Sequence, residues 1–312
     1  MTQENVMSGE ATVSPEKKLK KHNRQYTLRE SLLGYLFASP WIIGFIALMA
    51  FPLFYSLYLS FTNARTSSLF VNFVGWNNYR AILKDSAFWN SLLHTLWFVC
   101  LSVPLNLLFS LGIALLLNAK IPGKKFYRVL YYLPTLVTIV AVVFLWKQML
   151  SSSGVVNTML SWFHISGPDW FNDYKWATPG LVLMGMWSVG GTIIVFLSGL
   201  TDCPPELYEA ISIDGGGAFA KFFNVTMPSI SSIVFYNLLT GTIAAFQTFV
   251  QPMLMTGGAY NTDYLGYQIY YTGFTVGRQG YASAMSWLML VVVAVFVTLI
   301  KYGQKKLVVY ND

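Results

Sequence analysis

The sequence predicts an all-α membrane protein with six transmembrane helices. Of its 312 residues, 55% are hydrophobic and 11% are charged, whereas soluble domains average about 25% charged residues. Long stretches contain no Asp, Glu, Lys or Arg, and a bilayer needs only about 20 apolar helical residues. These stretches are Ser31–Ala64, Ser86–Ala119, Trp176–Thr201, Phe222–Thr262 and Gln279–Ile300. A membrane barrel is excluded, because its strands are short alternating segments and these runs are continuous.

The spans follow one another with polar connections between them. Span 1 is expected within residues 31–61, and an extracytoplasmic loop, residues 62–88, follows it. The other five spans fall within residues 89–302. The predicted boundaries are Leu32–Phe61, Trp89–Leu117, Val129–Leu150, Ala177–Leu200, Ser231–Met255 and Tyr281–Tyr302. A basic tail, residues 1–30, precedes the spans, and a short tail, residues 303–312, follows them.

Basic residues are unevenly distributed among these connections. Most of the 20 Lys and Arg residues lie before span 1, between spans 2 and 3, between spans 4 and 5, or after span 6. Cytoplasmic segments carry an excess of Lys and Arg, so both termini are expected on the cytoplasmic side of the cell (inner) membrane. The same distribution explains the net charge of +7 without nucleic-acid binding. The residues on that side are Lys17, Lys18, Lys20, Lys21, Arg24, Arg29, Lys120, Lys124, Lys125, Arg128, Lys221, Lys301, Lys305 and Lys306.

What the chain lacks excludes several function classes. Gly123-Lys124 has neither the upstream glycine nor the following Ser or Thr of a phosphate-binding loop. The span interiors carry no Asp, Glu, Lys or Arg, one of which proton or sodium coupling would usually need. His94 and Lys147 lie near span ends, and we interpret His94 as packing between helices or facing a loop. No cluster of His, Cys and carboxylates has catalytic or metal-ligand spacing, so neither an enzyme nor a bound cofactor or metal is expected.

A polar segment broken by glycines, residues 201–230, separates span 4 from span 5. Pro204-Pro205 suits a first helical turn. Gly215-Gly216-Gly217 suits the end of that helix, because glycine tolerates the positive φ of a C-terminal cap. A second helix is expected over Ala218–Met227, ended by Pro228. The sequence therefore predicts a helix–turn–helix on the cytoplasmic surface.

This helix–turn–helix offers a carboxylate and aromatic side chains to a soluble partner. The aromatic residues are Phe219, Phe222 and Phe223. The alternative is an amphipathic loop that lies on lipid. Glu209 and Asp214 disfavour that alternative, because anionic headgroups repel carboxylates.

The spacing of residues in this segment closely resembles the EAA motif, which occurs in the permease subunits of binding-protein-dependent ABC importers. The residues that carry the resemblance are Glu209, Ala210, Asp214, Gly215, Phe222 and Pro228. The sequence departs from the pattern at Ile211, Val225 and Met227, each of which keeps an apolar side chain.

The resemblance covers nearly the whole chain and narrows to the sugar-type permeases of the maltose and glycerol-3-phosphate group. The other segments that resemble this group are Pro40-Trp41 with Phe51–Thr62, Phe73–Tyr79, Phe126–Pro134 and Thr256–Ala284. Ala259 replaces a proline that is usual after the paired glycines. Single motifs are weak here, but their ordered set is specific.

The resemblance implies that residues 89–302 form an ABC type-1 transmembrane permease domain with residues 201–230 as its coupling loop. It implies a second, related permease subunit, two cytoplasmic ATPase subunits that bind ATP and Mg²⁺, and an extracytoplasmic solute-binding protein. The chain itself would be a non-catalytic subunit that moves a di- or oligosaccharide into the cytoplasm.

In the family, the substrate site lies in mid-membrane on the fourth and fifth spans. Small residues at helical spacing there could leave room for a sugar ring, and Trp187 and Gln247 could stack on it or bind it. Tight helix packing is an equal alternative explanation for the small residues. The candidate substrate-pathway residues are Met184, Trp187, Ser188, Gly191, Gly241, Ala245, Gln247 and Thr248.

Two other interpretations remain open. The same importer fold could carry a glycerol-phosphate ester, a polyamine, an amino acid or phosphate. An anionic cargo should be accompanied by Arg or Lys inside the spans, and their absence favours a neutral sugar. A stand-alone channel or a membrane enzyme is disfavoured by the partner-facing loop.

Overall fold

The structure, a computed structural model, describes residues 28–68, 70–119 and 121–307. These residues are helical, and apart from one antiparallel bridge between Thr62 and Phe73 they contain no β-structure. The predicted all-α class is confirmed. The predicted tails fall mostly on residues 1–27 and 308–312, which lie outside the described residues.

The chain divides into two compact units. Among the described residues, the first unit contains α1 (Leu28–Phe45), a π-helical turn (Ile46–Ala50) and the start of α2 (Phe51–Ser60). It ends at Leu53, and the second unit begins at Phe54. Each unit is described by itself.

The second unit contains the remaining helices. In chain order they are α3 (Asn77–Lys84), α4 (Ser86–Asn118), α5 (Lys124–Tyr132), α6 (Ile139–Met149), α7 (Val155–Trp162), α8 (Ala177–Trp187), α9 (Gly190–Thr201), α10 (Pro205–Ile213), α11 (Ala218–Lys221), α12 (Met227–Ser229), α13 (Ser231–Phe246), α14 (Val250–Met255), α15 (Leu265–Tyr270) and α16 (Gln279–Leu307). Short 3₁₀ or π-helical turns follow α5, α11 and α15.

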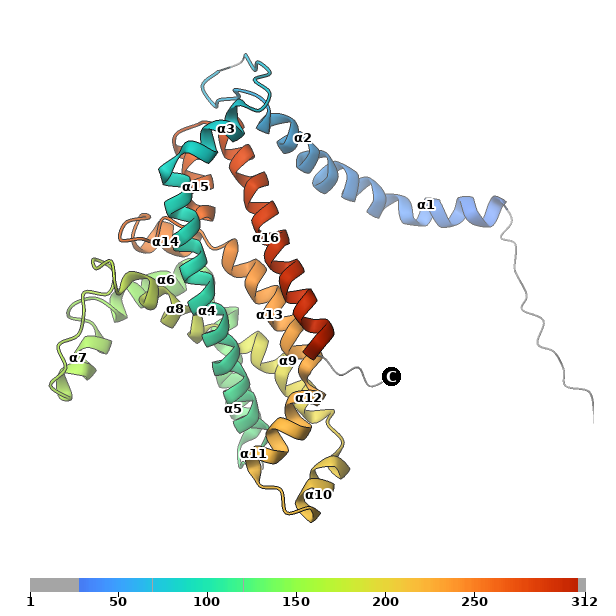
Figure 1. The fold of residues 1–312 in the computed structure, drawn as a ribbon, viewed down its shortest axis with the longest axis vertical. Coiled ribbons are helices and arrows are strands. Elements are labelled where there is room, and N and C mark those ends of the chain that lie inside the picture. Colours follow the sequence, from blue (N-terminus) through green and yellow to red (C-terminus); the bar gives the residue numbers. More distant parts are fainter. Residues whose placement is uncertain (1–27, 69, 120, 308–312) are drawn as a thin grey trace, which may run out of the picture. The chain divides into compact units, whose positions relative to one another are not determined.

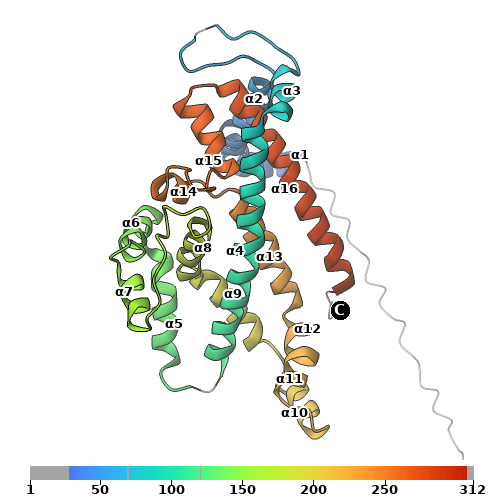
Figure 2. The same ribbon diagram turned by 60° about the vertical axis from the view of Figure 1, so that its left-hand side comes forward.

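The long helix α4 is the centre of the second unit. Asp85 begins it, because its carboxylate accepts a hydrogen bond from the Ala87 N–H at 2.9 Å. Helices α8, α9 and α13 pack along it, and buried apolar side chains fill the space between them. Both views show α3 and α15 at one end of this unit and α10 and α11 at the other (Figures 1 and 2). The junction of α4 and α5 lies at the same end as α10 and α11 (Figure 1).

Three helical stretches are long and apolar enough to cross a membrane: Leu32–Ser60, Ser86–Asn118 and Gln279–Gln304. Up to six spans result if each of three bent helix pairs counts as one. The bends measure 102° between Lys124–Leu136 and Ile139–Met149, 53° between α8 and α9, and 66° between Ala218–Ser229 and α13.

The predicted continuous helices for spans 3, 4 and 5 are therefore wrong in detail. Span 3 turns between Leu136 and Ile139, directly after a 3₁₀ turn, Leu133–Leu136, that contains Pro134. Span 4 breaks at Ser188-Val189, in front of Gly190-Gly191. Span 5 was predicted to reach Met255, but α13 ends at Phe246 and α14 starts a separate short helix.

Candidate functional site

Helix ends meet near the middle of the second unit. Helix α8 ends at Trp187 and α9 begins at Gly190, while α13 ends at Phe246 and α14 begins at Val250. The last carbonyl groups and first N–H groups of a helix have no partner within that helix. In a membrane, such backbone is tolerated only where it is buried in protein or lines a cavity. The two breaks are therefore expected to border a cavity.

A cavity of about 300 Å³ lies at these breaks. Its lining comes from α4, from the break between α8 and α9, from α13 and from α14. None of the lining side chains is charged, and its polar side chains are hydroxyls and amides. These polar residues are Ser102, Asn106, Ser188, Thr192, Asn237, Thr248 and Gln251. We call it the polar cavity.

Two polar atoms of its lining are buried without a hydrogen-bond partner among the described residues. They are Ser102 Oγ and Asn106 Oδ1, one helical turn apart on α4. Asn237 differs, because its side-chain amide donates to the Ile233 carbonyl at 2.9 Å. Native structures leave few such groups unpaired. The polar cavity therefore has hydrogen-bonding capacity that the described protein atoms leave unused.

The predicted substrate-pathway residues fall in different places. Ser188, Gly241, Ala245 and Thr248 line the polar cavity. Met184 is buried and, with Ser188, lines a smaller neighbouring cavity of about 200 Å³. The contact of any of these residues with a substrate stays a prediction.

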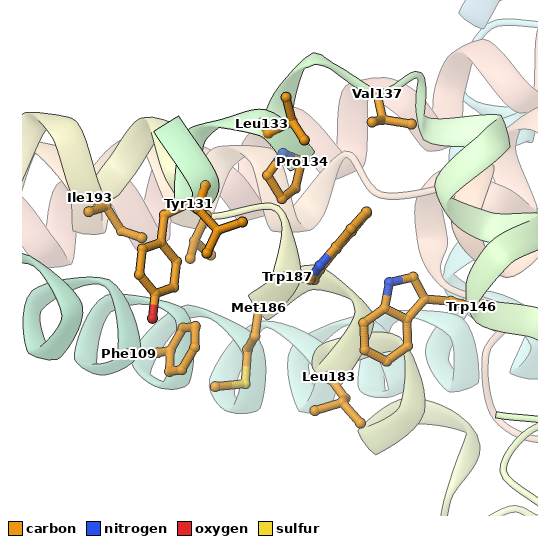
Figure 3. Close-up of a pocket in the computed structure, with 12 residues that line it drawn as sticks. Phe109, Tyr131, Leu133, Pro134, Val137, Trp146, Leu183, Met186, Trp187 and Ile193 are labelled. Atoms are coloured by element: carbon orange, nitrogen blue, oxygen red, sulfur yellow. The ribbon is translucent and has the colours of Figure 1, made fainter. Parts of the chain in front are cut away.

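Three other predicted residues lie away from the polar cavity. Gly191 and Gln247 are exposed and line neither the polar cavity nor the smaller cavity beside it. Trp187 lines a third, apolar cavity of about 410 Å³. Figure 3 shows Trp146 and Trp187 beside each other in this apolar cavity, with Leu133 and Pro134 across from them. The ring centroids of the two tryptophans are 6.3 Å apart.

The side-chain amides that line the polar cavity were not predicted from the sequence. Asn106 and Asn237 lie inside apolar spans on two different helices, and Gln251 lies beyond the break after α13. A signal for the two asparagines was present, because polar side chains inside a membrane span are expensive and tend to be functional.

The space around the glycines separates the two explanations offered for the small residues. A Cβ atom placed on Gly241 would meet only Val103 Cγ1, at 3.9 Å, and one on Gly191 would meet nothing within 4 Å. Neither glycine is required by close helix contact. Gly190 is different, because its Cβ would overlap the Tyr131 carbonyl oxygen. Tight packing therefore explains Gly190 but not Gly241.

The segment between α9 and α13 is a helix–turn–helix, as predicted. Pro205 occupies the first turn of α10, and Gly215 follows the helix with φ of +76°. The Gly216 N–H donates to the Ile211 carbonyl at 2.8 Å and closes the end of α10. The second helical stretch runs through α11, a π-helical turn and α12 to Ser229. It therefore extends past Pro228, which was expected to end it.

The predicted docking residues divide into an exposed and an anchored group. Glu209, Ala210, Asp214 and Gly215 are exposed. Phe222 and Pro228 are half-buried, and Phe222 packs on the apolar cluster at the ends of α4 and α9. The structure thus places these residues in one compact element, while their contact with a partner stays a prediction.

One side-chain contact braces this element. The Tyr208 hydroxyl on α10 lies 3.0 Å from Thr226 Oγ1 in the π-helical turn after α11. Burial is the main cause that raises the pKa of Tyr208, so this phenol stays protonated and can donate. The brace joins the two arms of the helix–turn–helix across 18 residues.

Known proteins resemble the chain over most of its length. No protein-family model matches it. It is 36% identical over 284 residues to the "Probable ABC transporter permease protein YesP" of Bacillus subtilis, covering 88% of this chain and 90% of that protein. The chain belongs to the permease proteins of ABC transporters. This permease is also 31% identical over 296 residues to the "Sulfoquinovosyl glycerol transport system permease protein SmoG" of Agrobacterium fabrum, covering 92% and 96%.

A solved structure supports the fold. The permease matches a chain of the "bacterial alginate ABC transporter in complex with alginate pentasaccharide-bound periplasmic protein" with a TM-score of 0.78 and 23% identity, covering 89% of this chain and 96% of that one. As a permease, the chain is a multi-pass membrane protein. It is a transport subunit of an ABC transporter and not an enzyme.

Proposed function

We propose that this permease moves a neutral carbohydrate, a di- or oligosaccharide, through the polar cavity. The observation that carries the proposal is the lining itself, in which hydroxyl and amide side chains surround about 300 Å³ and no side chain is charged. Sugar hydroxyls both donate and accept hydrogen bonds, and amides and hydroxyls offer both roles in return. A cavity for an anionic solute would be expected to contain Arg or Lys.

The buried groups of α4 supply part of the selectivity in this proposal. Asn106 Oδ1 and Ser102 Oγ are unpaired acceptors, and a sugar hydroxyl would satisfy them. A site built to bind a hydroxyl rejects a solute that lacks it, because its own buried groups are then left unpaired. The names of SmoG and of the alginate transporter refer to sugar derivatives and support a carbohydrate cargo. Alginate is acidic, so the neutrality of the cargo proposed here rests on the uncharged lining alone.

Energy would come from partner subunits that dock on the helix–turn–helix. Its tip carries the exposed carboxylates Glu209 and Asp214 together with exposed apolar side chains, Ile213 at 86% and Phe219 at 83%. A protein partner that docks on this tip would cover these apolar side chains together with the two carboxylates. We infer two ATPase subunits that hold ATP and Mg²⁺, a second permease subunit and an extracytoplasmic binding protein.

In this arrangement the helix–turn–helix lies on the cytoplasmic side of the inner membrane, as do both termini. Movement of the ATPases would be transmitted through α10 and the braced second arm to α9 and α13, which line the polar cavity. Packed elements move as units, so the two breaks are the points at which the cavity walls can change angle.

Uptake of labelled sugars by cells that express the whole transporter tests this function. Asn106→Leu should lower uptake of the accepted sugar roughly two- to tenfold, because one hydrogen bond contributes about 0.5–1.5 kcal/mol and about 1.4 kcal/mol is tenfold. The amount of permease in the membrane should be unchanged. Asn90→Leu on the exposed side of the same helix is the matched control and should leave uptake unchanged.

Two results would contradict the proposal in different ways. Unchanged uptake in both Asn106→Leu and Asn237→Leu would refute the polar cavity as the pathway. Uptake of a charged, non-sugar solute, with no sugar of the panel accepted, would keep the pathway and refute the cargo.

A further inference from the structure

The start of α5 carries a basic stripe. Lys124 caps the preceding helix, since its Nζ donates to the Asn118 carbonyl at 3.0 Å. Lys125 and Arg128 are exposed. Among the residues that the structure describes, no carboxylate lies within ion-pair distance of either. Two cations therefore stand one helical turn apart without a counter-charge.

The helix that carries this stripe also lines an apolar cavity. It measures about 290 Å³ and lies between the end of α4 and α5. Tyr127 and Tyr131, four residues apart on α5, form one wall. The remaining lining consists of aliphatic residues: Ile113, Leu116, Leu117, Ala119 and Ile121. Such a predominantly apolar lining favours an apolar occupant.

The apolar surface continues toward the middle of the second unit. Tyr131 also lines the apolar cavity of about 410 Å³ that is shown in Figure 3. That cavity continues past Phe109 and Leu133 to Trp187. The two apolar cavities therefore share one lining side chain, that of Tyr131.

We propose that the groove between α4 and α5 binds an anionic phospholipid. Arg128 and Lys125 hold the phosphate of the headgroup, and one acyl chain enters the cavity lined by Tyr127 and Tyr131. The charge of the stripe is complementary to a phosphate, which guanidinium groups bind in bidentate fashion. The apolar lining is complementary to an acyl chain, whose burial contributes about 0.8 kcal/mol per methylene. A free phosphate or a nucleotide would leave the apolar cavity empty.

This site is separate from the polar cavity in its lining and in its chemistry. Among the residues named for the two sites, none is shared. Lipid at this position would fix α5 against α4 and thereby hold the wall of span 3 in place. The inference does not depend on the identity of the transported solute.

Native mass spectrometry of the purified whole transporter tests the site, with phosphatidylglycerol and phosphatidylcholine as the two probes. The wild-type complex should retain phosphatidylglycerol in preference to phosphatidylcholine. In the double variant Lys125→Gln/Arg128→Gln the apparent affinity for phosphatidylglycerol should fall roughly 30-fold, because each basic residue near a membrane surface contributes about 1 kcal/mol and about 1.4 kcal/mol is tenfold.

Two further variants distinguish this site from general charge effects. Lys84→Gln/Lys301→Gln removes two exposed charges elsewhere and should retain the lipid preference. Leu116→Trp fills the apolar cavity while keeping the charges, and it should lower retention of phosphatidylglycerol without altering the amount of folded complex. Equal retention in all variants, or retention that falls equally with the control pair, would overturn the proposal. So would loss of an ATPase subunit from the stripe variant with lipid retention unchanged.

Discussion

Gly190 and Gly191 are adjacent in sequence but differ in their surroundings. Gly190 is buried where α9 crosses α5, and a Cβ there would overlap the Tyr131 carbonyl oxygen. Gly191 points into open space. A small residue in a membrane helix therefore has no fixed meaning until the neighbouring backbone is known.

This pair gives a prediction with an internal control. Gly190→Ala should lower the free energy of unfolding by about 1–3 kcal/mol, because backbone has to move to admit the methyl group. Gly191→Ala should leave stability unchanged or slightly raise it, since alanine favours helix. Thermal unfolding of the two purified variants in the same detergent measures the difference. Equal midpoints would show that α5 yields freely at this crossing.

The role of two asparagines likewise depends on which residues surround them. Asn106 and Asn237 are separated by more of the chain than any local pattern spans, yet both line the polar cavity. The sequence of each helix marks each residue as an expensive exception to an apolar run. Asn106 and Asn237 line the same cavity only because α13 packs against α4.

At the scale of elements, the helix–turn–helix was the most predictable part of the chain. Proline at its start and glycine at its turn act through local backbone geometry, which does not depend on distant contacts. Gly215 has φ of +76°, as its place after the first helix predicted. The π-helical turn at Phe222–Thr226, in which Val225 and Thr226 are buried, was not predicted from the sequence.

The turn gives the second prediction. Gly215→Pro should abolish transport while membrane insertion is retained, because proline fixes φ near −65° and removes the N–H that Gly215 donates to Ser212. Gly217→Pro is the matched control, since Gly217 already has φ of −78° and open space for a side chain. Uptake and membrane abundance are measured for both. Normal transport by Gly215→Pro would remove the coupling role from this turn.

The broken spans show where element prediction failed. Hydrophobicity places a stretch in the membrane, but it does not say whether that stretch is straight. The bends of 102°, 53° and 66° place backbone ends inside the second unit, where other helices and cavities receive them. The free-energy cost of interrupting a membrane helix is offset by contacts with residues that are distant in sequence.

At the scale of the whole molecule, contacts between distant segments join α4 to the loop before α15. The buried Leu265 N–H donates to Thr95 Oγ1 at 2.7 Å, across 170 residues. Next to this contact, His94 Nδ1, one residue before Thr95, lies 2.6 Å from Oδ1 of Asp263, two residues before Leu265. His94 was expected either to pack between helices or to face a loop. It faces a loop, because Asp263 lies in the segment between α14 and α15.

The third prediction belongs to this contact. Thr95→Val keeps the shape of the side chain but leaves the Leu265 N–H buried without its acceptor, which costs about 1–3 kcal/mol. Amide hydrogen exchange at Leu265 should become faster, and the unfolding midpoint should fall. Thr298→Val is the control, because the Thr298 hydroxyl is exposed and bonds only within its own helix. Unchanged exchange at Leu265 would mean that this hydrogen bond does not hold the loop.

The sequence by itself determined the membrane class, the all-α fold, the polar helix–turn–helix and the absence of charge from the span interiors. These properties are local, since composition, periodicity and turn residues act within a few helical turns. The tertiary structure alone decided which spans break, which glycines are required by packing and which polar side chains share a cavity. Those properties depend on contacts between segments far apart in the chain, and no local pattern encodes how α4, α9 and α13 pack together.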